Sequence, residues 1–124
     1  MKTPEDICPE FPEWPERWHG LDEDIPYGEG ILTVIRPFVE YLIQKGLKKK
    51  TIRNHMANLW LLGGEIIRDV SLHEEYQIPP LDKVKQAVDS EGGPYCRHIS
   101  SEWELKAFDA TCRQLHRFLT AANL

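Results

Sequence analysis

The sequence predicts an all-α fold, a compact bundle of four or five helices with an extended N-terminal arm. Apolar residues recur with a helical period in four stretches, which cover residues 28–46, 48–70, 81–89 and 101–119. No stretch alternates apolar and polar residues in the manner of a half-buried strand. The arm is predicted because prolines at a three-residue spacing favour polyproline II and forbid a continuous helix; they are Pro9, Pro12 and Pro15.

The chain has 124 residues, enough for one domain with a modest single core. Hydrophobic residues make up 41% and charged residues 28%, as in ordinary soluble globular proteins. No run of about 18 apolar residues occurs, so neither a membrane span nor a membrane partner is expected.

The acidic start lacks the apolar core of a signal peptide, and three cysteines is an odd count. Both features favour a reducing, cytoplasmic location.

The chain divides into two predicted regions, an acidic arm over residues 1–26 and a helical domain over residues 27–124. Residues 1–30 hold nine acidic and two basic residues. The arm also holds three aromatic side chains that are too apolar for a solvated tail: Phe11, Trp14 and Trp18. We expect them to dock on the helical domain, as terminal segments commonly do. The alternative is that they form a ligand for the aromatic groove of a protein partner.

The first predicted helix ends at Gly46 and carries an apolar stripe made of Ile31, Val34, Ile35, Phe38, Leu42 and Ile43. Pro37 lies inside it, so either the helix kinks there or the segment is two helices. The second predicted helix, over residues 48–70, is the longest, and its stripe is Ile52, Met56, Leu59, Gly63, Ile66 and Val70. Gly63 and Gly64 each cost about 1 kcal/mol relative to alanine inside a helix. They therefore indicate close approach of another helix or a bend.

Two further helices complete the predicted bundle. The segment "LDKVKQAVD" predicts a short third helix over residues 81–89. The last helix is predicted to begin near Ser101, which forms a capping-box pattern with Glu104. Its apolar stripe consists of Leu105, Phe108, Cys112, Leu115 and Leu119.

The basic residues concentrate in one segment, although the formal net charge of the chain is -5. Residues 36–68 hold seven basic and only two acidic residues. With Ile52 toward the core, the outward residues of the second predicted helix are Lys50, Arg53, Asn54, Ala57 and Asn58. Small and amide side chains between cations suit a helix that reads a DNA groove, because Asn pairs with adenine edges and Lys and Arg bind phosphates. The helix N-terminus also favours a nearby phosphate.

The alternative for this helix is a solvated face, since most amphipathic helices carry Lys and Arg outside only because that face must be polar. The last helix has a second outward stripe that could join the first in one basic surface. Its residues are Lys106, Ala110, Arg113 and Arg117.

The segment "FVEYLIQKGLKKKTIRNHMANL", followed later by "FDATCRQLHRFL", resembles the core-binding, SAM-like domain of tyrosine recombinases and phage integrases. The resemblance covers roughly residues 30–121. Its distinctive features are an aromatic-rich helix, a Gly-Leu turn and a Thr-Ile pair that opens the next helix. The matching residues are Phe38, Tyr41, Leu42, Gly46, Leu47, Thr51, Ile52 and Leu59, then Arg113, Phe118 and Leu119.

The resemblance implies a helical bundle that clamps one side of duplex DNA with its second and last helices. Carried over by position, the DNA-binding residues are Lys49, Lys50, Thr51, Arg53, Asn54 and Asn58, then Arg113 and Arg117. The family's chemistry belongs to a separate catalytic domain, which we do not expect in this chain, so neither catalytic residues nor enzymatic activity are expected. Position 48, where the family often has a capping serine, is Lys in this chain, so the second helix either starts less firmly or uses Thr51 as its cap.

No cofactor is predicted, and one group of residues has the composition of a metal site. Its four residues could surround zinc, because Cys112 and His116 are four residues apart on one helix and Cys96 and His98 follow a turn. Against this, Cys112 lies in an apolar stripe, where a cysteine serves as a small core residue. Cys-x-His is also tighter than the usual zinc spacing. Core packing is therefore the preferred interpretation.

The residues and the resemblance predict two alternative functions. The first is a stand-alone, non-catalytic DNA-binding domain that acts as an accessory or regulator of DNA integration and recombination. The second is a protein–protein interaction module that keeps the recombinase-like bundle without binding DNA and contacts a recombinase or another protein through the arm. We also expect the acidic arm to fold across the basic helix and weaken DNA binding, so that deleting residues 1–24 tightens it.

Overall fold

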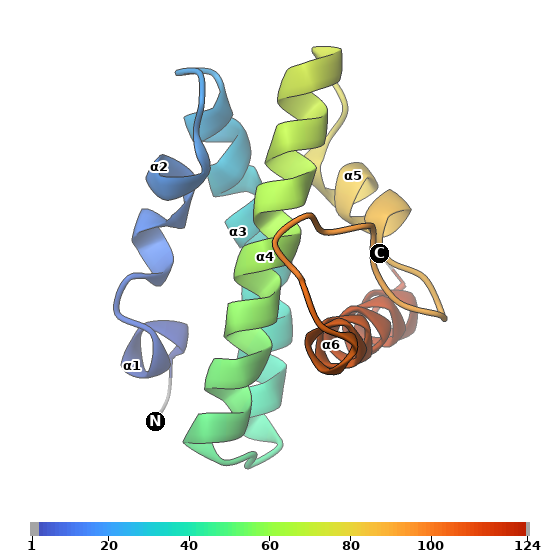
Figure 1. Ribbon diagram of the computed structural model, residues 1–124. Coiled ribbons are helices and arrows are strands. Elements are labelled where there is room, and N and C mark those ends of the chain that lie inside the picture. The colour runs from blue at the N-terminus through green and yellow to red at the C-terminus, as the bar shows by residue number, and fades with distance from the viewer. Residues whose placement is uncertain (1–2, 124) are drawn as a thin grey trace.

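The computed structural model describes residues 3–123, and these residues form helices and no strands (Figure 1). The all-α prediction is confirmed. In chain order the elements are α1 (Pro4–Ile7), the 3-10 helix η1 (Phe11–Glu13), α2 (Trp14–Trp18), α3 (Asp24–Gln44), α4 (Lys49–His73), α5 (Pro80–Ala87) and α6 (Glu102–Ala121).

The helices α3 and α4 form the centre of the molecule, with α4 in front of α3 in Figure 1. Gly46 adopts a positive φ of 78° in the turn between them, a conformation that a side chain would strain. Their facing stripes are fully buried and include Phe38 and Leu42 of α3 and Ile52 and Leu59 of α4. Pro37 lies inside α3 without dividing it, so the segment is one helix.

The helix α4 begins one residue later and ends three residues later than predicted. Lys48 is its N-cap and makes no side-chain capping bond, and Thr51 lies within the helix, so it does not serve as the cap. Within the part of the chain that the structure describes, the backbone N–H groups of the first turn therefore have no side-chain partner. At the other end, the left-handed Glu74 (φ 53°) terminates the helix.

The N-terminal segment is not an extended arm, and that part of the prediction was wrong. It folds into α1, η1 and α2, whose first turns hold Pro4, Pro12 and Pro15. Proline is well tolerated there because the first N–H groups of a helix have no partner within the helix. The spacing that excludes one long helix is therefore compatible with three short ones.

Docking of the N-terminal aromatic residues on the helical body is confirmed. Phe11 and Trp14 are buried, and Trp18 packs against the core. In Figure 1, α1 and α2 lie alongside the central pair. The predicted boundary between residues 26 and 27 falls inside α3, so the N-terminal segment and the helical domain share one core.

The close approach predicted at the α4 glycines occurs, and the neighbour is Trp18 of α2. A Cβ on Gly63 would lie 2.2 Å from Cζ2 of the Trp18 ring. The indole N–H of Trp18 donates to the Trp60 carbonyl over 3.0 Å, and Trp14 packs edge-on against the Trp60 ring. Gly63 therefore provides the space in which α2 docks on α4.

The helices α5 and α6 lie on the side of α4 that faces away from α1 and α2 (Figure 1). Ser101 caps α6, and its Oγ accepts from the Glu104 N–H over 3.1 Å, which confirms one half of the predicted capping box. The Glu104 carboxylate accepts from the Ser101 hydroxyl over 2.9 Å. Four members of the predicted α6 stripe are buried, whereas Leu105 is 43% exposed. The loop between α5 and α6 crosses in front of α4 in Figure 1.

Candidate nucleic-acid interface

The predicted DNA-binding residues at the start of α4 lie on the surface. Five of them are exposed: Lys49, Lys50, Thr51, Arg53 and Asn54. No hydrogen bond or ion pair within residues 3–123 engages their side chains. Ile52, on the opposite side of the same turn, is fully buried. Core packing of α4 thus directs this polar group outward.

The surroundings of this group are strongly basic. No acidic residue occurs between Glu40 and Glu65, whereas this stretch holds five cations: Lys45, Lys48, Lys49, Lys50 and Arg53. The uncapped N–H groups at the start of α4 add the positive end of the helix dipole. A field of this kind attracts anions and weakens with added salt.

The acidic N-terminal segment does not cover this surface, contrary to the expectation. Glu5 forms an ion pair with Arg36 of α3, and Glu13 pairs with Arg17 four residues later at 3.3 Å. Because Phe11 and Trp14 belong to the core, deleting this segment would remove core packing rather than a cover.

Asn58 differs from the other predicted residues because its amide is used inside the bundle. Its Nδ2 donates to the Thr111 hydroxyl over 2.9 Å and to the Ala107 carbonyl over 3.2 Å. An amide nitrogen has two hydrogens, so both are occupied. This arrangement argues against the predicted contact between Asn58 and a base edge.

His55 joins the same connection between α4 and α6. Its Nδ1 lies 2.8 Å from the hydroxyl of Thr111, a residue that is buried. Burial lowers the pKa of His55 below its usual value, because the charged imidazolium loses hydration. His55, Asn58 and Thr111 therefore form a polar connection that fixes α6 on the side of α4.

Of the two predicted arginines of α6, Arg113 does not join the α4 group, whereas Arg117 lies near Lys45. Arg113 donates to the Glu91 carbonyl over 3.3 Å, and it lies about 200° around α6 from Thr111, the residue that faces α4. Arg117 is exposed and lines a hollow of about 450 Å³ with Lys45, Tyr41 and Phe118. The expected single surface over both helices is therefore not formed through Arg113.

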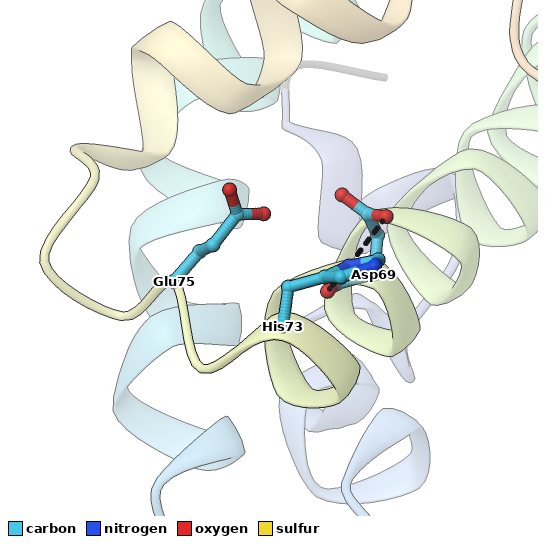
Figure 2. A group of neighbouring side chains, drawn as sticks. All are labelled: Asp69, His73 and Glu75. Carbon is cyan, nitrogen blue, oxygen red and sulfur yellow. Dashed lines mark hydrogen bonds and ion pairs between the residues drawn. The ribbon is translucent and has the colours of Figure 1, made fainter.

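The described residues contain one convergent group of three possible metal ligands, Asp69, His73 and Glu75 (Figure 2). Lys83 already neutralises it, since its ammonium donates to Asp69 Oδ2 over 2.7 Å and to Glu75 Oε1 over 2.8 Å. Burial alone would lower the pKa of Lys83, but the two carboxylates outweigh it and raise that pKa. The group is thus a buried lysine with its two counter-ions, and His73 at its edge.

The four residues considered for zinc do not converge in this way. Cys112 is fully buried, and burial raises the pKa of its thiol to about 12, which opposes the thiolate that zinc needs. Cys96 is also buried, and burial raises its pKa too. The interpretation of Cys112 as a core residue agrees with its position.

The structure also contains a groove along α4 that the sequence does not predict. This groove of about 470 Å³ lies along the second half of α4, with arginines from three separate segments around it: Arg17, Arg68 and Arg97. These segments are far apart in the chain, so no local motif could reveal the groove.

Comparison with protein-family models, with curated proteins and with solved structures gave no match to this chain. The resemblance to the recombinase core-binding domain therefore stays a prediction from the residues quoted above. No helix of the described chain combines the length and apolar character that crossing a membrane requires.

Proposed function

We propose that this chain is a non-catalytic DNA-binding domain whose contact surface is the start of α4. The proposal is carried by a set of exposed polar side chains on the helix face opposite the core, which have no partner among the described residues 3–123. They are Lys49, Lys50, Arg53 and Asn54. An accessory or regulatory role in DNA recombination rests in addition on the sequence resemblance.

The basic residues and the asparagine make different kinds of contact in this proposal. Lys49, Lys50 and Arg53 supply cations for phosphate oxygens, which hold the domain on the duplex without reading sequence. Asn54 is the candidate for a base contact, since its amide can both donate to and accept from an adenine edge. Ala57, one turn further on, is small and exposed, so the duplex backbone can approach the helix closely.

An NMR amide-shift titration with a short duplex tests the proposal. We expect shifts concentrated at residues 49–57 that shrink as the salt concentration rises. The variant Arg53→Gln should bind more weakly, whereas Lys85→Gln, which removes an exposed cation from α5, should bind as the wild type does. Absence of shifts at low salt, with the fold intact, would refute the proposal.

A protein-interaction module is the second candidate, and exposed apolar side chains favour it. Tyr95 is 84% exposed, Trp103 82% and Leu72 68%. The N-terminal aromatic residues no longer support it, because Phe11 and Trp14 are buried in the core. Shifts at Tyr95, Trp103 and Leu72 with a protein partner, together with none on duplex DNA, would select this function.

A further inference from the structure

We propose that the DNA-binding surface continues along α4 into the groove between α2 and the loop before α6. There, Arg17, Arg68 and Arg97 bind the phosphate backbone of the same duplex. This inference rests on the proposed function and extends its contact surface to elements outside the resemblance.

Helical geometry places the groove in line with the predicted site. Residues spaced by three or four share one face of a helix, and the outward face of α4 runs through Lys50, Asn54, Ala57, Leu61, Gly64 and Arg68. At 1.5 Å per residue this strip is roughly 27 Å long. A duplex that contacts Lys50 and Asn54 can therefore reach the groove by following the same helix.

The shape of the groove suits a backbone that approaches closely. Its floor includes Leu61 and Gly64 of α4, and Gly64 has no side chain to hold the duplex away. One wall comes from α2 and the segment after it, and the other from the loop before α6; their residues in the groove include Arg17, His19, Arg97 and His98. In Figure 1, α2 lies to the left of α4, and the loop between α5 and α6 comes from the right and passes in front of α4.

The charges favour an anionic occupant. Arg68 and Arg97 are exposed, and within the described residues no acidic side chain pairs with either. Arg17 pairs with Glu13, but both side chains are more than half exposed, so the pair is weak and open to exchange. Three guanidinium groups from three elements therefore face one groove, and each can bind a phosphate with two parallel hydrogen bonds.

Two carboxylates lie in the groove, but neither of them is exposed. Asp24 is buried, and its carboxylate accepts from the N–H groups of Gly20 and Leu21 and from the Tyr76 hydroxyl. Glu65 is half-buried beside Cys96, whose pKa is raised by burial and further by this carboxylate. The exposed charge at the groove is thus dominated by the arginines.

The N-terminal segment has a definite role in this arrangement. Trp18 is fixed on α4 by its bond to the Trp60 carbonyl and by its contact with Gly63, and Arg17 precedes it directly. Docking of α2 therefore builds one wall of the groove. The segment that the sequence predicted to weaken DNA binding would support it.

Fluorescence anisotropy with a labelled random-sequence duplex, measured over a salt series, tests the inference. The variants are Arg68→Gln, Arg97→Gln and the double variant, with Arg53→Gln as the reference for the first site and Lys85→Gln as the matched control. We expect each groove variant to bind about threefold or more weakly and to lower the salt slope by about one. Thermal unfolding checks that each variant is folded.

The outcomes separate the two proposals. If Arg53→Gln weakens binding while both groove variants and the double variant match Lys85→Gln, the groove is not a phosphate site and the proposed function stands. If the wild type does not bind duplex even at low salt, the proposed function fails and this inference fails with it. Tight binding of an acidic peptide in place of DNA, lost in the groove variants, would assign the groove to a protein partner instead.

Discussion

The two halves of α4 continue one outward face but differ in composition and in neighbours, since this face holds Lys50 and Asn54 in the first half and Leu61 and Gly64 in the second. Over the first half, Lys50 and Asn54 are exposed, and no side chain within residues 3–123 pairs with them. Over the second half, Trp18 packs against Gly63 on one side, and Arg97 and His98 of the loop before α6 approach from the other. The difference shows that the small residues of the second half allow other segments to pack beside α4, and that this packing turns the helix face into a groove.

The largest expected effect tests whether the N-terminal segment belongs to the core. Phe11 is fully buried against Trp14 and beneath the Arg36 guanidinium. The variant Phe11→Ala should lose about 3–5 kcal/mol of unfolding free energy, because it leaves a cavity. Urea unfolding measures the loss. Trp103→Ala, at an 82% exposed position, is the control and should change little. Equal stability of the two variants would mean that the segment does not pack as described.

A pair of adjacent glycines sharpens the comparison within α4. Gly63→Ala places a Cβ 2.2 Å from the Trp18 ring, so it should destabilise the protein by about 1–3 kcal/mol through overpacking. Gly64→Ala meets the same ring at 3.4 Å, an ordinary contact, and should be neutral or stabilising by up to about 1 kcal/mol through helix propensity. Thermal or urea unfolding of both variants gives the comparison. Similar losses at the two positions would contradict the docking of Trp18 on Gly63.

The variants Asn54→Ala and Asn58→Ala test which asparagine faces DNA. Asn58→Ala should cost about 1 kcal/mol of stability, because it removes the bonds to Thr111 and Ala107, and it should leave DNA affinity unchanged while the protein is folded. Asn54→Ala should show the opposite pattern, with unchanged stability and weaker binding. Urea unfolding and DNA titration of both variants distinguish the roles. A loss of affinity with Asn58→Ala alone would reverse the assignment.

The smallest expected effect concerns pH. Because burial lowers the pKa of His55 below 6.5, the unfolded chain takes up a proton more readily than the folded protein. The stability contributed by the neutral imidazole is complete above about pH 6.5 and declines as the pH falls from there toward the lower folded pKa. Thermal unfolding between about pH 7.5 and 5.5 should show this decline. The variant His55→Gln keeps a polar group that does not titrate, so its stability should decline less over this pH range. Identical pH profiles of the variant and the wild type would exclude His55 as the source of the decline.

The sequence predicts most of the helices correctly where they are long and amphipathic. The stripes around Ile52 in α4 and Phe108 in α6 repeat over several turns, so their period identifies both the helix and its buried face. Each short N-terminal helix spans too few residues for any period to appear. Pro12 and Pro15 then indicated an extended segment, although each occupies a helix position that tolerates proline.

The sequence predicts only part of the candidate site, because a helical wheel uses the residue order of one helix alone. A helical wheel correctly places Lys50, Arg53 and Asn54 away from the core. The same wheel places Asn58 outside as well, because a wheel contains no information on where α6 packs. The groove was beyond prediction, since Arg17, Arg68 and Arg97 belong to three separate segments.

The sequence by itself determined the helical class, the buried faces of α3, α4 and α6, and the basic, acid-free stretch at the start of α4. These follow from residue order, because periodicity and local charge are properties of neighbouring positions. Only the tertiary structure decided that the N-terminal segment joins the core, that Asn58 binds α6, and that three distant arginines share a groove. Those outcomes depend on packing between segments far apart in the chain, where the fit of Trp18 against Gly63 has no local signature.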